Sequence, residues 1–331
     1  MSRMSNPEQL WDRFQLGHRG ALARLLTQAE SDPSSLEPIF PALQSALKWA
    51  PRWGITGAGG VGKSTLVDAI TQDLRARGTS VGILATDPTS EISGGALLGD
   101  RVRFSAMEPD DGVFFRSVAH RGARGGLSAA VHDQLDLLDG FGFDQLILEA
   151  VGAGQTETDI SYAVDLVLVV FSPEAGDAVQ AMKAGLMEVG DLYCISKADL
   201  GGAERAKETL EAALALRRGA QASVSAESSQ PPVLTVSAIQ QPGSIVCSGD
   251  VVSNLVSTAI RRFDQLNQSG ELQRRRAQRK VRRVRAAALR LLEQRLLTEE
   301  VVADLVRRSE ERAPARLAED LVAGLMPPES S

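Results

Sequence analysis

Nine consecutive residues in the first third of the chain have the spacing of a phosphate-binding loop. The segment matches the pattern G-x-x-x-x-G-K-[ST] and consists of Gly57, Ala58, Gly59, Gly60, Val61, Gly62, Lys63, Ser64 and Thr65. The glycines allow backbone N–H groups to turn inward around an anion, and the helix expected from Ser64 adds partial positive charge at its N-terminus. We therefore predict that all nine residues bind nucleotide phosphates, with Lys63 as the catalytic cation and the Ser64 hydroxyl as a ligand of Mg²⁺.

Carboxylates follow two β-rich runs, where a magnesium ion beside the phosphates would need them. Asp87 comes directly after the run 80–86, and Glu149 ends the run 145–149. Mg²⁺ takes few protein carboxylates and completes its shell with water and phosphate oxygens, so two or three acidic residues suffice. The predicted metal ligands are therefore Ser64, Asp87 and Glu149, with Asp100 as a further candidate. The alternative for each acid is a surface carboxylate that caps a turn.

A third pattern concerns the base of the nucleotide. The segment Ser196-Lys197-Ala198-Asp199 follows a β-rich run, and Ser237-Ala238 follows the next one. In the pattern [NT]-K-x-D, the aspartate accepts hydrogen bonds from the N1–H and the exocyclic amine of guanine, a donor pair that adenine lacks. A buried carboxylate left unpaired would penalise adenine, so the pattern predicts GTP and GDP as the bound nucleotides. Ser196 stands where Asn is usual, and its shorter side chain reaches less far.

These motifs require a parallel sheet whose strand ends carry the loops. Between residues 51 and 265, short β-rich runs alternate with helical patterns, which is typical of βαβ units. Several runs are apolar nearly throughout, as strands buried on both faces should be. We expect an α/β fold with a mostly parallel central sheet flanked by helices. The predicted strands are 53–56, 80–86, 145–149, 166–171, 192–196 and 233–236, and the predicted helices are 64–77, 127–138, 178–188 and 204–216.

Composition narrows the class of protein further. The chain has 331 residues, of which 43% are hydrophobic, and a formal charge of −6. This length fits roughly two globular domains, and this apolar content excludes disorder throughout. The longest clean apolar run, 166–171, is far shorter than the roughly 20 residues of a membrane-spanning helix, and the N-terminus lacks the apolar region of a secretory signal. Two cysteines make no disulfide framework. We expect a soluble, cytoplasmic protein.

Positive charge is concentrated near the C-terminus. Residues 271–296 contain ten Arg or Lys and two Glu, a local charge of +8, which leaves −14 for the remainder. From about residue 250 onward the pattern is helical, with no β signal. A basic helical arm of this kind pairs with an acidic surface. Nucleic acid is an alternative partner, but no aromatic residue interrupts the basic run, so we expect no stacking on single strands and no nucleic-acid partner. We expect no membrane partner either, because the apolar runs are too short.

The order and spacing of these motifs resemble one family over residues 15–265, the MeaB/ArgK-type P-loop GTPases associated with methylmalonyl-CoA mutase. The matching pieces are GITGAGGVGKSTLVDAI, ATDPTS with GGALLGD, ILEAVGAGQTETD, SPEAGDAVQAMKAGLMEVGD, SKAD and TVSA. The segment after Glu149 discriminates best, because generic GTPases have D-x-x-G there. Ser196, Ala150 and Glu174 depart from the family's usual residues.

The resemblance implies a P-loop NTPase fold with an N-terminal helical segment (1–50), a GTPase domain (51–265) and a basic C-terminal helical dimerisation arm with its tail (266–331). It implies that Ile239 joins Ser237 and Ala238 at the guanine, and that Asp100 lies in a mobile switch. Gln155 and Glu157 would belong to a second switch, and residues 173–183 to a third that senses the partner.

The activity implied by the resemblance is Mg²⁺-dependent hydrolysis of GTP to GDP and phosphate, which we expect to be slow without a partner. The implied role is that of a homodimeric chaperone for a cobalamin-dependent acyl-CoA mutase of the methylmalonyl-CoA mutase type. Such a chaperone gates cofactor loading and protects the mutase from inactivation.

Two other functions remain open at this point. A metal-insertion GTPase for nickel or cobalt enzymes would need a Cys/His cluster, whereas Cys194, Cys247, His18, His120 and His132 are scattered along the chain. A small-molecule kinase, or the transport-system kinase of an older family label, would need an acceptor other than water. The signature set of protein kinases is missing from the sequence.

Overall fold

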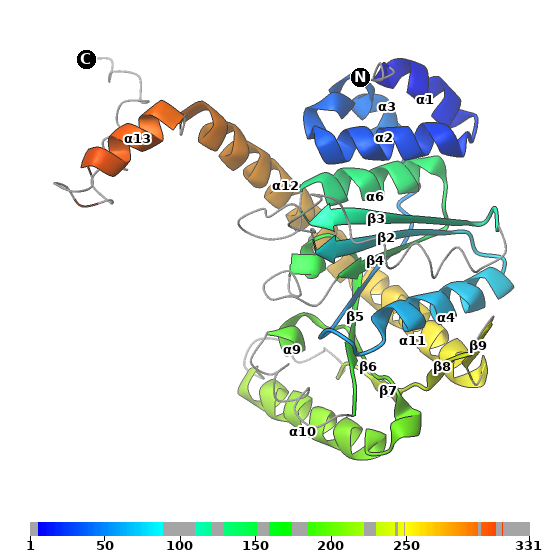
Figure 1. The fold of residues 1–331 in the computed structure, drawn as a ribbon. Helices are drawn as coiled ribbons and strands as arrows, with labels where there is room; N and C mark the ends of the chain where they lie inside the picture. Colours follow the sequence, from blue (N-terminus) through cyan, green and yellow to red (C-terminus); the bar gives the residue numbers. More distant parts are fainter. Residues whose placement is uncertain are drawn as a thin grey trace. The chain divides into compact units, whose positions relative to one another are not determined.

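The structure is a computed structural model that describes residues 6–88, 110–120, 129–150, 159–173, 185–221, 230–241, 244–247, 249–296, 299–308 and 313. The chain divides into two compact units, Met1–Ala277 and Gln278–Ser331. Figure 1 shows the order of the elements along the chain. The candidate site lies entirely in the first unit.

A sheet of seven strands forms the centre of the first unit (Figure 1), and every described pair of neighbouring strands in it is parallel. The strand order is β3-β2-β4-β1-β5-β6-β7, so the strand that precedes the phosphate loop is the central one. The strands are β1 (Arg52–Thr56), β2 (Val81–Pro88), β3 (Val113–His120), β4 (Gln145–Ala150), β5 (Leu166–Phe171), β6 (Leu192–Ile195) and β7 (Val233–Thr235). The predicted α/β fold is confirmed.

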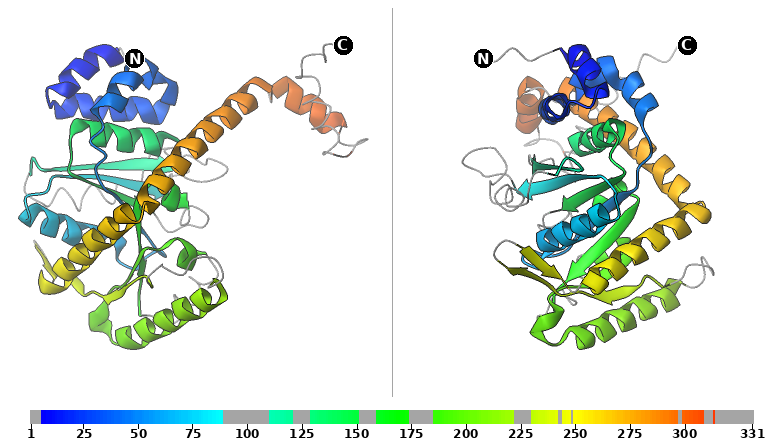
Figure 2. Two further views of the ribbon diagram at one scale, coloured as in Figure 1. Left: turned by 180° about the vertical axis from the view of Figure 1, so that it is seen from behind. Right: turned by 90° about the vertical axis from the view of Figure 1, so that its right-hand side faces the viewer.

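Helices cover both faces of the sheet, which explains why its inner strands are buried and mostly apolar. Along β5, Leu166, Leu168 and Val170 pack with α4 (Lys63–Ala76) and α11 (Gly249–Gln268). The alternate residues Val167, Val169 and Phe171 belong to the other core, with α6 (Ala129–Phe141) and α10 (Ala203–Gln221). Figure 2 shows α4 and α11 lying beside each other on their face of the sheet.

The N-terminal helices pack over α6 (Figure 1). They are α1 (Pro7–Gln15), α2 (Arg19–Ser31), the 3-10 helix Pro33–Ile39 and α3 (Phe40–Ala46). The ring of Phe14 lies 4.8 Å from that of Trp11 and 5.2 Å from that of Phe141, which joins α1 to α6 through aromatic contacts. The predicted helical character of residues 1–50 is therefore confirmed for the described part.

Short elements complete the first unit. They are the 3-10 helices Ile160–Tyr162 and Ala198–Leu200, the helix α9 (Leu186–Val189), and an antiparallel hairpin of β8 (Ala238–Gln241) and β9 (Ser244–Cys247). The sequence did not predict β3 or this hairpin. Of the predicted helix 178–188, only residues 186–188 are both described and helical, and the rest has no description.

The C-terminal part is helical, as predicted. It consists of α12 (Glu271–Leu296), which begins in the first unit, and α13 (Glu299–Arg308). No helix in the described part of the chain is both long enough and apolar enough to span a membrane.

Candidate functional site

The phosphate loop leaves the carboxyl end of the central strand and enters α4. Gly57, the first loop residue, has a φ of +144°, and a Cβ there would lie 2.1 Å from the carbonyl oxygen of Val170 on β5. Gly62 has a φ of +93° and caps α4 at its N-terminus. Glycine is required at both positions because the backbone adopts conformations that L side chains rarely reach. The loop residues thus have the local geometry that the motif predicts.

Lys63 is the first residue of α4 and is buried. Its Nζ donates hydrogen bonds to the carbonyl oxygens of Gly57 and Ala58, each at 2.8 Å. A buried ammonium needs such partners, because burial removes its water. The loop folds around the cation, which sets a positive charge at the N-terminus of a helix, where anions bind.

Two of the predicted metal ligands lie in direct contact. The hydroxyl of Ser64 donates a hydrogen bond of 2.7 Å to Oε1 of Glu149, which is buried at the carboxyl end of β4. Thr86 of β2 donates to the main-chain carbonyl of Glu149 at 3.1 Å. Asp87, one residue further along β2, lies opposite Ala119 of β3. A hydroxyl and a carboxylate are hard oxygen donors, so these residues fit Mg²⁺.

Asp100 lies outside the described residues, as do Gln155, Glu157 and residues 174–183. Within the ranges that the structure describes, no group of three or more His, Cys, Asp or Glu side chains could hold a metal ion. Cys194 is buried in β6, where burial raises the pKa of its thiol to about 12. A thiol in this state behaves as a small apolar residue.

Ser196, the first residue of the predicted base-recognition segment, attaches this segment to the phosphate loop. The hydroxyl of Ser196 lies within hydrogen-bond distance of two main-chain carbonyl oxygens, those of Val61 and Phe171. Its backbone N–H donates to the Phe171 carbonyl at 2.8 Å. The sequence predicted a side chain that reaches less far than Asn. The structure adds a function that the sequence did not predict, because Ser196 joins loops that are 135 residues apart.

The remaining residues that the sequence predicts at the base come together at the ends of β6 and β7. Lys197 has a φ of +52°, an uncommon conformation for a residue other than glycine. The hydroxyl of Ser237 donates to Oδ1 of Asp199 at 2.7 Å, which orients the carboxylate. Ala238 and Ile239 follow as the first residues of β8. The structure therefore brings the two predicted base segments into contact, although they are separated by about 40 residues in the sequence.

A parallel sheet, a glycine-rich loop from its central strand and a buried lysine at the start of the next helix define a P-loop nucleotide-binding protein. The family model described as "Methylmalonyl Co-A mutase-associated GTPase MeaB" matches residues 22–301. The chain belongs to the MeaB family of P-loop GTPases, so the resemblance stated from the motifs is confirmed.

Individual relatives agree with this assignment. A Pyrococcus horikoshii protein that carries the name GTPase is 44% identical over 211 residues, which cover 64% of this chain and 67% of the relative. A Caenorhabditis elegans protein named "Methylmalonic aciduria type A homolog, mitochondrial" is 32% identical over 287 residues, 82% of this chain and 69% of the relative. A solved structure titled "LAO/AO transport system kinase" superposes with a TM-score of 0.69 at 24% identity. The superposition covers 98% of this chain and 99% of the solved chain, and it supports the fold.

Proposed function

We propose that this chain is a GTP-dependent chaperone of a cobalamin-dependent acyl-CoA mutase of the methylmalonyl-CoA mutase type. In this role it gates loading of the cofactor and protects the mutase. The observation that carries the proposal is membership of a family described as mutase-associated, over residues 22–301. The relative named for methylmalonic aciduria supports the same partner class.

The nucleotide chemistry follows from the residues of the loop. The backbone amides of residues 57–65 and the ammonium of Lys63 would hold the phosphates and stabilise charge that develops during hydrolysis of GTP to GDP and phosphate. Ser64, Glu149 and Asp87 would hold Mg²⁺, which supplies charge neutralisation at the β- and γ-phosphates. In the described part of the chain we identify no side chain that would orient the attacking water, so we expect slow hydrolysis without a partner.

Selection of guanine would rest on Asp199, whose carboxylate Ser237 holds by a hydrogen bond of 2.7 Å. The substitution Asp199→Asn tests this directly, because an amide donates to the second carbonyl of xanthine where the carboxylate accepts from guanine. We expect the variant to lose GTP and bind xanthosine triphosphate, by a change in preference of at least about tenfold. Unchanged preference for GTP would show that Asp199 does not contact the base.

The mutase partner is tested by capture. The purified full-length chain is immobilised and offered a cobalamin-dependent methylmalonyl-CoA mutase with a non-hydrolysable GTP analogue, with GDP or without nucleotide. We expect retention that depends on the nucleotide, and loss of that dependence in Lys63→Ala. Equal absence of retention in all three conditions would contradict the proposed partner.

The same proposal includes a homodimer formed through the C-terminal arm. In the second unit, α12 exposes Val281, Val284 and Leu291, at 69%, 71% and 53% of their surface. Their spacing of three and seven residues places them on one side of a helix, as a helix–helix contact requires. Light scattering should give twice the chain mass for the unmodified protein and a monomer for V281E/V284E. Ala286→Glu, which adds charge on another side, should remain a dimer.

A further inference from the structure

Three aspartates each lie one residue before a strand. They form one edge of the sheet, where the parallel strands begin, and the candidate site lies at the opposite edge, where the strands end. Each aspartate donates its own backbone N–H to a residue in, or directly before, the neighbouring strand and accepts the backbone N–H of a residue there with its carboxylate. Asp144 accepts from Ser80 at 2.9 Å, Asp165 from Arg52 at 3.2 Å, and Asp191 from Val167 at 2.9 Å. We call these residues the edge clamps. They fix the register at which β2 meets β4, β1 meets β5, and β5 meets β6.

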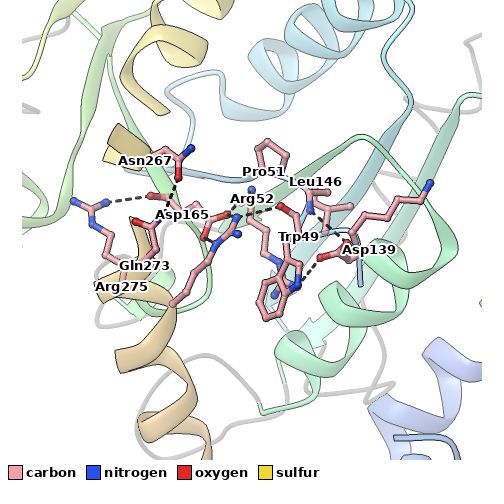
Figure 3. Close-up of polar contacts among 12 residues, drawn as sticks. Trp49, Pro51, Arg52, Asp139, Leu146, Asp165, Asn267, Gln273 and Arg275 are labelled. Carbon is pink, nitrogen blue, oxygen red and sulfur yellow. Dashed lines mark hydrogen bonds and ion pairs between the residues drawn. The ribbon is translucent and has the colours of Figure 1, made fainter. Parts of the chain in front are cut away.

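Two of the three edge clamps are also paired with arginines from the second turn of α12. Arg275 forms a bidentate pair with Asp191, with N···O distances of 2.8 and 2.9 Å, and donates to the main-chain carbonyl of Asp165 at 3.1 Å. Arg276 forms a bidentate pair with the Asp165 carboxylate at 2.7 and 3.1 Å. Figure 3 shows Arg275, Asp165 and Arg52 lying together at this edge. Bidentate pairs of this kind are strong and directional.

Both carboxylates are almost completely buried, with 0% and 4% of the side-chain surface of Asp165 and Asp191 exposed. Removing the counter-ion of a buried carboxylate strongly destabilises the folded protein, because an uncompensated charge stays buried. Burial alone would lower the pKa of Arg275, but the hydrogen bonds and charges of Asp191 and Glu271 outweigh burial and hold that pKa above its ordinary value. Asp165 and Asp191 therefore depend on the second turn of α12 for their charge balance.

The segment before β1 is tied to the same turn. Arg276 donates to the main-chain carbonyl of Trp49 at 3.2 Å, and its guanidinium lies 5.6 Å from the centre of the indole ring. Trp49 has a φ of +60°, which is rare for an aromatic residue. Arg52, at the start of β1, completes the cluster through Asp136 and Asp139 of α6, at 2.7 and 3.2 Å.

The three strands joined by Asp165 and Asp191 are β1, β5 and β6, and at their other ends they meet the phosphate loop and the predicted base segment. β1 continues into the phosphate loop at Gly57, and β6 continues into the base segment that begins at Ser196. Between them, β5 ends at Phe171, whose carbonyl accepts from Ser196. With four to six residues each, the strands separate the two edges by only about 13–20 Å.

From this arrangement we infer that Arg275 and Arg276 are positioning residues for the nucleotide site. The docked second turn of α12 fixes β1, β5 and β6 relative to one another, and therefore fixes the phosphate loop relative to the base segment. A nucleotide that contacts both loops favours the same arrangement. If docking of this turn strengthens nucleotide binding by some factor, thermodynamic linkage requires that bound nucleotide strengthen the docking by the same factor. The inference rests on the proposed nucleotide site.

The experiment compares full-length variants that remove arginine side chains from neighbouring positions, two in the test variant and one in the control. R275Q/R276Q removes both pairs to the edge clamps. The matched control is Arg274→Gln, because Arg274 is 69% exposed and its ion pair is with Glu271 in its own helix. We expect GDP, measured with a fluorescent GDP analogue, to bind R275Q/R276Q at least about fivefold more weakly, within the usual range of coupling between sites, and to bind Arg274→Gln as it binds the unmodified chain. R275K/R276K keeps the charge but not the bidentate geometry and should lie between.

A second measurement uses the unmodified protein. Bound GDP should slow hydrogen exchange of the amides of residues 271–277. If R275Q/R276Q unfolds cooperatively and binds GDP within twofold of the Arg274→Gln control, the arginines are merely structural and the inference is wrong. If that variant does not fold, exchange in the unmodified chain decides, and no change on adding GDP overturns the inference. Failure of the unmodified chain to bind any guanine nucleotide would instead refute the proposed function, and the inference with it.

Discussion

The close approach of the phosphate loop to β5 predicts a large effect of the single substitution Gly57→Ala. Gly57 has a φ of +144°, and an added Cβ would meet the Val170 carbonyl oxygen at 2.1 Å, its carbon at 3.1 Å and the Val170 nitrogen at 3.4 Å. All three atoms are backbone atoms of a buried strand. No side chain can rotate away to make room, so the loop, the strand or both must shift.

Two penalties add at this position. An L residue at this φ has about 1–3 kcal/mol of backbone strain, and forcing an extra carbon into a packed region costs typically another 1–3 kcal/mol. Together they predict a loss of about 2–6 kcal/mol in the free energy of unfolding, which is a large part of the 5–15 kcal/mol typical of a folded domain. The shift would also displace the phosphate-binding amides, so nucleotide affinity should fall as well.

Two neighbouring glycines provide matched controls. Neither Gly59 nor Gly60 has an atom within 4 Å of an added Cβ, and only Gly60 has a positive φ, of +77°. Urea-induced unfolding without nucleotide should therefore rank the three alanine variants. The free energy of unfolding of Gly59→Ala should equal that of the unmodified chain or exceed it by up to about 1 kcal/mol. It should fall by about 1–2 kcal/mol in Gly60→Ala, and it should fall most in Gly57→Ala. Equal stability of Gly57→Ala and Gly59→Ala would refute the reasoning.

Three further predictions follow from polar and titrating groups. Ser196→Ala removes the hydroxyl that reaches two carbonyl oxygens, so it should cost about 0.5–1.5 kcal/mol in urea unfolding and weaken GDP binding, whereas unchanged GDP binding would show that this link does not support the site. Hydrogen bonds from Ser80 lower the pKa of Asp144, so this carboxylate contributes stability above about pH 4 that is lost as pH falls through its lower pKa in the folded state. The difference in urea midpoint between the unmodified chain and Asp144→Asn should therefore shrink between pH 5 and 3, and a constant difference would exclude an ionic contribution. Cys194, with its pKa raised to about 12 by burial, should resist iodoacetamide at pH 8 until urea unfolds the chain, and peptide mapping that finds it alkylated in the folded protein would contradict its burial.

The parts of the fold that sequence reasoning predicted are those in which one local property decides the structure. Strands such as 166–171 are apolar on both faces, because helices cover both sides of a parallel sheet. Such continuous apolar runs can be recognised in the sequence. The edge strand β3 includes Arg116, whose side chain pairs with Glu30 of α2, and its mixed composition did not stand out. The hairpin of β8 and β9 has a Pro-Gly pair between its strands, at 242–243, a turn signal that could have revealed it.

In the candidate site the same division holds between local patterns and distant contacts. The motif specifies the loop because its glycines are required by backbone geometry within nine residues. The link from Ser196 to the Val61 carbonyl joins residues 135 positions apart, and no local pattern encodes it. The hydrogen bond from Ser237 to Asp199 was not derivable either, because it depends on β6 and β7 being neighbours in the sheet.

The uneven distribution of charge has a structural explanation at the start of α12. From the sequence, the excess of arginine in residues 271–296 indicated a need for acidic residues on another surface. In the second turn, Arg275 and Arg276 pair with acidic residues of the same chain, Asp191 and Asp165. Buried pairs of this kind add little net stability compared with apolar residues of the same size, because desolvation offsets their attraction. What they provide is a defined position, since a bidentate pair tolerates few geometries. A helix whose second turn is held in this way has a fixed starting point on the edge of the sheet opposite the phosphate loop, and this is the property that a positioning role requires.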